Sequence, residues 1–172
     1  MVAGRASQRG TNMLREILGI LEKDGRITAK KISDMTGYPT TEVNRIIKQA
    51  QQDRIIMKYK AVINWSKIED EQVWAMISVR VTPQKDVGFD SIAERIYRFP
   101  KVRSVYLASG EYDLMVLVVG KSEHEVADFV SQKLASIEGV QGTATHFILK
   151  RYKEDGEILM EAAEVKRQQL IL

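Results

Sequence analysis

One stretch of the sequence is dense in side chains that can make several hydrogen bonds at once. Residues 40–49 place amides, hydroxyls and cations between the apolar positions Val43, Ile46 and Ile47. Such groups pair with base edges in the major groove of DNA or with backbone phosphates. We expect base contacts from Asn44 and Arg45. The residues expected to touch DNA are Thr28, Lys30, Lys31, Thr40, Thr41, Asn44, Arg45, Lys48 and Lys58.

Groups suited to catalysis or metal binding are sparse. The chain has two histidines and no cysteine, which excludes disulfides, thiolate zinc sites and cysteine nucleophiles. His124 and His146 stand far apart and belong to no metalloprotease, P-loop or dinucleotide-binding motif. We therefore predict a protein that is not an enzyme, with no catalytic residue, no metal and no cofactor.

Charge divides the chain into two parts. Residues 1–66 carry 12 Lys and Arg against 6 Asp and Glu, whereas residues 67–172 carry 14 against 17. A basic front part joined to a mildly acidic back part is typical of a nucleic-acid-binding module fused to a second module. The lack of cysteine fits a reducing cytoplasm. The longest apolar run, Leu114–Val119, is too short to span a bilayer, so we expect a cytoplasmic protein with no membrane partner.

Helical periodicity predicts three helices in the front part. Residues 1–11 are expected to form a flexible basic arm. Apolar positions repeat at helical spacing over Asn12–Lys23 and Thr28–Thr36, where Met35 is expected to face inward. Pro39 suits the first turn of a third helix that ends near Gln52. Two short helices joined by a glycine turn make a helix-turn-helix over residues 12–56, although the polar face of the third helix is alternatively a solvated surface.

The front part ends in an extended segment. Ile55–Ile63 alternates around Lys58 and Lys60, which predicts a strand or wing. We assign residues 57–72 to this wing strand and a linker.

Two β-α-β units follow over residues 73–152. Val73–Val81 alternates between apolar and other residues, as in a strand with one buried face. Two amphipathic helices are expected, one with Ile92, Ile96 and Tyr97 inward and one opened by the capping box at Ser122. The order β-α-β-β-α-β predicts a ferredoxin-like antiparallel sheet. The remaining strands are expected at Val102–Ser109, Tyr112–Val119 and Val140–Arg151.

One face of such a sheet is left without helices. It still carries large apolar groups, either the set with Trp74 and Met76 or its alternate, which predicts a homodimer interface. Residues 153–172 form a C-terminal extension with a loose helical pattern over Glu157–Leu170.

Two motifs resemble those of one family of regulators. Glu22-Lys23-Asp24-Gly25-Arg26-Ile27 and, later in the chain, Ser109-Gly110-Glu111-Tyr112-Asp113 resemble, as a pair in this order, motifs of the Lrp/AsnC (leucine-responsive regulator/asparagine regulator) family. The resemblance covers about residues 12–152. It implies an α+β fold with an N-terminal winged helix-turn-helix domain and a ferredoxin-like domain. It also implies a DNA-binding transcriptional regulator that forms dimers and often octamers.

The resemblance also implies an amino-acid effector. A free amino acid needs a carboxylate near its ammonium group and N–H donors near its carboxylate. Asp113 or Glu111 would supply the first and the backbone at Gly110 the second. Alternatively, this loop is only a hairpin turn. The implied effector residues are Ser109, Gly110, Glu111, Tyr112, Asp113, Thr143 and Thr145.

Three positions depart from the family pattern. Tyr38 stands where a capping serine is usual, Ala50 where leucine is usual and Arg54 where glycine is usual. Two other functions fit the same architecture. One is a haem-precursor (sirohaem) decarboxylase, in which the recognition helix tends to lose the basic character that Arg45 and Lys48 keep here. The other is a ligand sensor without DNA binding.

Overall fold

The chain forms two compact units, Met1–Ala61 and Val62–Leu172. The computed structural model describes residues 3–68, 72–82 and 88–160. Among these residues, no helix combines the length and apolar character needed to cross a membrane.

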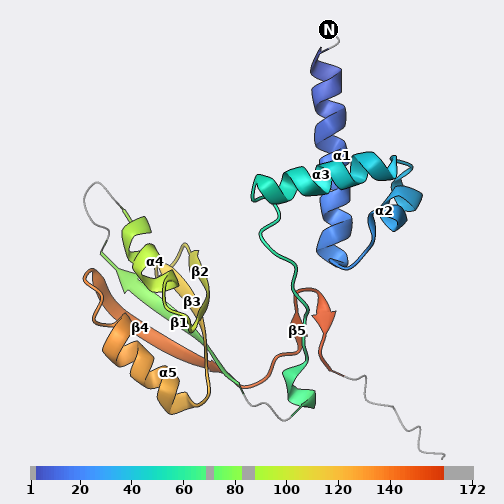
Figure 1. The fold of residues 1–172 in the computed structure, drawn as a ribbon. Coiled ribbons are helices and arrows are strands. Elements are labelled where there is room, and N and C mark those ends of the chain that lie inside the picture. Colours follow the sequence, from blue (N-terminus) through green and yellow to red (C-terminus); the bar gives the residue numbers. More distant parts are fainter. Residues whose placement is uncertain (1–2, 69–71, 83–87, 161–172) are drawn as a thin grey trace, which may run out of the picture. The chain divides into compact units, whose positions relative to one another are not determined.

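The front unit is a bundle of three helices (Figure 1). They are α1 (Ala3–Lys23), α2 (Ala29–Thr36) and α3 (Thr40–Gln52). Ile17, Ile32 and Val43, one from each helix, are fully buried and pack in one cluster with Ile46. This cluster confirms the predicted inward faces of α1 and α3.

Local hydrogen bonds set the turn between α2 and α3. The Thr28 hydroxyl caps α2 by accepting from the Lys31 N–H at 3.2 Å. Gly37 ends α2 with a φ of 76°, the left-handed conformation that favours glycine. Tyr38 provides no cap for α3, but its phenol donates to the Glu16 carboxylate at 2.7 Å and so ties the turn to α1.

Three predictions in the front unit are wrong. Helix α1 begins at Ala3 rather than Asn12, so the predicted flexible arm is helical from Ala3 onward. Met35 is 57% exposed rather than inward. Ile55–Ile63 forms no strand, and Lys58 lies in irregular chain. A lone strand has no ladder partner to satisfy its backbone groups.

The end of α3 explains one departure from the family pattern. Arg54 has a φ of 56°, and the N–H groups of Ile55 and Ile56 both donate to the Ala50 carbonyl at 2.9 and 3.0 Å. This left-handed position is where glycine costs least. Arg54 therefore holds the same turn with some backbone strain.

The back unit is the predicted ferredoxin-like fold. Its elements are β1 (Val73–Val81), α4 (Asp90–Tyr97), β2 (Val102–Leu107), β3 (Leu114–Gly120), α5 (Glu123–Phe129) and β4 (Val140–Ile148). The strands form one antiparallel sheet in the order β2-β3-β1-β4. A π-helical stretch, Val130–Leu134, prolongs α5.

The core lies between the sheet and its two helices (Figure 1). Ala75, Ile77 and Val79 of β1 are fully buried and face Ile92 and Ile96 of α4 in the same cluster. The alternation predicted for β1 is thus confirmed. Tyr97, predicted to face inward, is 57% exposed because it lies at the last residue of α4.

The other sheet face carries the alternate residues. Trp74, Met76 and Ser78 of β1 stand opposite Val119, Leu117 and Met115 of β3. Because opposed residues of an antiparallel pair share a face, these side chains form a strip that is apolar except for the Ser78 hydroxyl, which donates to the Met115 sulfur at 3.4 Å. We call this strip the open face, since α4 and α5 pack on the other side.

A small hairpin follows the sheet. Strands β5 (Lys153–Glu154) and β6 (Glu157–Ile158) pair across Asp155 and Gly156, whose φ values are 44° and 89°. Asp-Gly is a favoured pair for such tight hairpins. The helical pattern expected from Glu157 is therefore wrong at its start, and its remainder, residues 161–172, lies outside the described residues.

Glu125 links the first turn of α5 to Lys101, which lies in the connection between α4 and β2. Ser122 caps α5 by accepting from the Glu125 N–H at 3.1 Å. The Glu125 carboxylate accepts from the Lys101 ammonium and from the Lys121 N–H. The Lys101 hydrogen bond chiefly, and the Lys121 N–H next, lower the pKa of Glu125 below its usual range.

We predict that Glu125→Gln makes the stability of the fold vary less with pH in the acidic range. A carboxylate with a lowered pKa stabilises the fold at neutral pH, and this contribution disappears as pH falls through its folded-state pKa. The variant should therefore melt below the parent at pH 7, with the gap closing in acid. Calorimetric Tm against pH measures this, with Glu138→Gln as control. A gap that stays constant with pH would contradict the assignment.

Candidate nucleic-acid interface and small-molecule site

The exposed face of α3 carries the predicted DNA-contacting groups. Thr41, Asn44, Arg45 and Lys48 are exposed, and Thr40, the first residue of the helix, is half-buried. The opposite face holds the helix in the bundle through its buried apolar residues. Side chains on this rigid helix therefore project together from one surface.

Arg45 is held by a neighbour on the same helix. Its Nε and Nη2 atoms donate to the two Glu42 carboxylate oxygens at 3.0 and 2.7 Å. This bidentate bond is the main cause that lowers the pKa of Glu42 and raises the pKa of Arg45. Since 64% of the Arg45 side chain is exposed, the pair is weak and exchanges readily for another acceptor.

The other predicted DNA contacts lie apart from α3. Lys30 and Lys31 are exposed in the first turn of α2, directly after the Thr28 cap. The Thr28 hydroxyl is engaged with the Lys31 N–H. Lys58 is exposed on the irregular segment after α3 rather than on a strand.

The loop between β2 and β3 is fastened to the centre of the sheet by Asp113. Its N–H donates to the Val79 carbonyl at 3.0 Å, and its carboxylate accepts from the Val81 N–H at 2.8 Å. Its own carbonyl accepts from the Ala108 N–H at 2.8 Å. Asp113 is half-buried, so its hydrogen bonds position the loop rather than leaving a free acid.

Beside this anchor lies an exposed pair of opposite charges. Arg80, at the end of β1, donates to the Glu111 carboxylate at 3.0 Å, and its guanidinium lies 5.2 Å from the centre of the Tyr112 ring. The two charged side chains are 51% and 73% exposed. Arg80 was missed from the sequence, where it is only an outward position of a strand. The sequence does not show that Arg80 lies beside the loop that carries Glu111 and Tyr112.

The remaining predicted effector residues divide between two surfaces. Ser109 and Gly110 are exposed in the loop, and Gly110 has a φ of 135°. Thr143 and Thr145 pair with Val79 and Ile77, so they share the helix-covered face and are half-buried. One chain therefore gathers Glu111, Tyr112 and Asp113 around Arg80 but does not place the two threonines with them.

Comparisons with known proteins agree with this architecture. Residues 12–57 match the model of a winged helix-turn-helix DNA-binding domain, and residues 74–158 match the Lrp/AsnC ligand-binding domain. The uncharacterized HTH-type transcriptional regulator YugG of Bacillus subtilis is 48% identical over 88% of this chain and 92% of its own. The HTH-type transcriptional regulator FL11 of Pyrococcus furiosus is 31% identical over 84% of this chain and 92% of its own.

A solved structure shows the same arrangement. The complex of transcriptional regulator NMB0573 from Neisseria meningitidis with L-Met superposes with a TM-score of 0.66 at 25% identity, covering 83% of this chain and 91% of that one. The fold and matches define a DNA-binding transcriptional regulator. The chain belongs to the Lrp/AsnC family.

Proposed function

We propose that this regulator reads double-stranded DNA with the exposed face of α3, under the control of a small amino acid bound beside Arg80. The observation that carries the DNA part is the joint exposure of Asn44, Arg45 and Lys48 on the second helix of a helix-turn-helix. The major groove admits such a helix. Regulation without a catalytic step follows from this use of the fold.

The Glu42–Arg45 pair supports a base-reading role for Arg45. Because the pair is exposed and weak, the guanidinium can leave Glu42 at little cost for a guanine edge, which offers two acceptors to the same planar fork. Lys30, Lys31 and Lys48 are suited to phosphates, which position a protein without specifying sequence.

We predict that Arg45→Ala weakens binding to a specific site by about 1–3 kcal/mol. The target is a duplex selected by the protein from a random library, and affinity is measured by gel shift across salt concentrations. Lys48→Ala is the comparison, since a phosphate contact should weaken selected and random duplexes alike and reduce the salt slope. An equal loss on both duplexes for Arg45→Ala would make it a phosphate contact. No binding to any duplex would favour a sensor without DNA binding.

An amino acid matches the Arg80–Glu111 pair in charge. A zwitterion presents a carboxylate and an ammonium group close together, and the exposed pair offers a guanidinium and a carboxylate 3.0 Å apart. Inserting the ligand exchanges one weak surface ion pair for two, with Tyr112 alongside. The neighbouring NMB0573 structure holds L-Met, which supports an amino acid as the class of effector here.

We predict that at least one common amino acid releases or absorbs heat on titration into the protein. Arg80→Gln and Glu111→Gln should each weaken this binding about tenfold, the effect of losing one charged contact. Arg103→Gln, an exposed change elsewhere in the sheet, should leave it unchanged. An absence of heat with every amino acid, from a folded protein, would remove the effector proposal.

A homodimer through the open face would supply two DNA-reading units. Met76, Leu117 and Met115 are partly exposed there, and apolar strips of this kind are common between identical subunits. Two-fold symmetry suits major grooves one helical turn, about 34 Å, apart. An octamer would contain four such dimers.

We predict that light scattering gives a mass of two chains or an even multiple at micromolar concentration. Leu117→Lys should lower that mass, because it places a charge in the apolar strip. Lys133→Gln, at an exposed position on the helical side, is the control. A parent protein that is already a monomer would contradict the proposed interface.

A further inference from the structure

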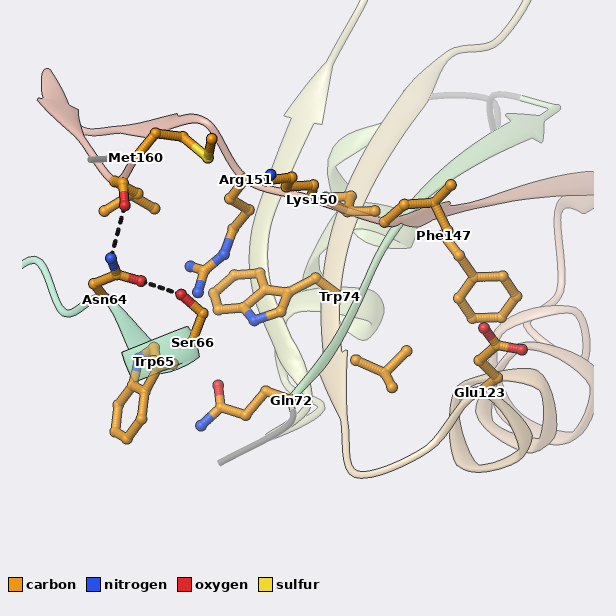
Figure 2. A pocket seen from close by; sticks show the side chains of 14 residues that line it. Asn64, Trp65, Ser66, Gln72, Trp74, Glu123, Phe147, Lys150, Arg151 and Met160 are labelled. Carbon is orange, nitrogen blue, oxygen red and sulfur yellow. Dashed lines mark hydrogen bonds between the residues drawn. The ribbon is translucent and has the colours of Figure 1, made fainter. Parts of the chain in front are cut away.

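A cavity lies in the back unit, at the opposite end of β1 from Arg80. It has a volume of about 770 Å³ and is bordered by the Trp65–Lys67 turn, the start of β1, the end of β4 and the chain after β6 (Figure 2). Trp74 and Arg80 are six positions apart along the strand, about 20 Å at the usual rise per residue. The cavity is therefore separate from the candidate effector site.

Both tryptophans of the chain line this cavity. Trp65 and Trp74 contribute to its wall together with Lys150 and Arg151. Polar and apolar groups both contribute to the lining, and a cavity of this size can hold a small molecule.

The wall is closed by a contact between distant segments. Asn64 donates its amide to the Leu159 carbonyl at 2.7 Å and accepts from the Ser66 hydroxyl at 2.6 Å (Figure 2). One hydrogen bond thus joins the chain before β1 to the chain after β6, and a second, local one orients the Asn64 amide.

Arg151 is a cation that is mostly removed from water. Only 18% of its side chain is exposed, and its guanidinium carbon lies 4.5 Å from the centre of the Trp74 ring. Among the described residues, its one ion pair is a long contact of 3.9 Å with Glu154. A stacked guanidinium keeps its N–H donors in its own plane, where a carboxylate can accept two of them.

Trp74 adds an unsatisfied donor to the cavity wall. Its Nε1 atom is buried and has no hydrogen-bond partner among the described residues. A buried N–H without an acceptor costs free energy, which a bound acceptor would recover. Among the described residues of the wall, Lys150 and Arg151 outnumber the one acid, Glu123, which favours an anion.

We propose that this cavity binds a small aromatic carboxylate. The carboxylate pairs with the Arg151 guanidinium, and the flat ring lies against the indole walls. An anion suits this cavity because of the buried guanidinium, the unpaired indole N–H and the excess of positive charge. A flat apolar ring suits the two tryptophans.

Benzoate and benzamide provide a matched pair of probes for the full-length chain. They share a flat ring and differ in charge, and tryptophan fluorescence with calorimetry follows their binding. Benzoate is expected to quench saturably and to bind about tenfold or more tighter than benzamide. Equal affinity for the two probes, or no binding by the folded protein, would overturn the proposal.

Variants assign the binding to this cavity. Arg151→Gln should abolish the preference for benzoate, and Arg151→Lys should restore it only in part, because the lysine lacks the planar fork. Trp74→Phe keeps a ring, removes the N–H and leaves Trp65 as the reporter, so it should weaken benzoate binding even if Arg151→Gln fails to fold. Arg80→Gln, at the candidate effector site, should bind benzoate as the parent does.

A second copy of the chain is the competing occupant. If Arg151→Gln changed the mass measured by light scattering and the parent protein did not bind benzoate, the cavity would be a contact between subunits. The proposal would then be wrong. If benzoate binding survived both Arg151→Gln and Trp74→Phe, the probe would bind elsewhere, which would also overturn it.

Discussion

The back unit depends on the pairing of β1 with strands on both sides. β1 is hydrogen-bonded to β3 along one edge and to β4 along the other, and its buried face supplies Ala75, Ile77 and Val79 to the core. Because side chains alternate along a strand, the same register that buries these residues fixes which neighbours face outward. One strand thereby fixes the core, the open face and, at its two ends, the positions of Arg80 and Trp74.

The two ends of β1 use arginine in different ways. Arg80 is half-exposed and paired with an exposed acid, so water screens its interaction and exchange of partners costs little. Arg151, over Trp74, is mostly buried and has only a long contact with Glu154. Removal from water strengthens any charge interaction that it makes. The arrangement at Arg80 suits a ligand that dissociates readily, whereas the arrangement at Arg151 suits a ligand that dissociates slowly.

The sequence predicted the fold well because strong periodicity left few alternatives. β1 has the predicted bounds, and Thr28 and Ser122 cap their helices as their residue types indicate. Failures fell where no local pattern decides the outcome. Ile55–Ile63 alternates like a strand but pairs with no strand among the described residues, and Glu157 and Ile158, at the start of the predicted helical pattern, form a strand after the Asp155–Gly156 turn instead. Of the candidate sites, the exposed face of α3 was predictable, whereas Arg80 and Arg151 required the tertiary register.

The bond between Asn64 and Leu159 joins residues 95 positions apart and has a consequence for synthesis on the ribosome. The helical unit is complete by Ala61, so it emerges and folds while most of the sheet is still untranslated. β1 must wait for β4, its last partner, and the segment around Asn64 must wait longer still. During elongation the nascent chain therefore carries a finished helical head and an unpaired apolar strand, the stage at which chaperones have most to protect.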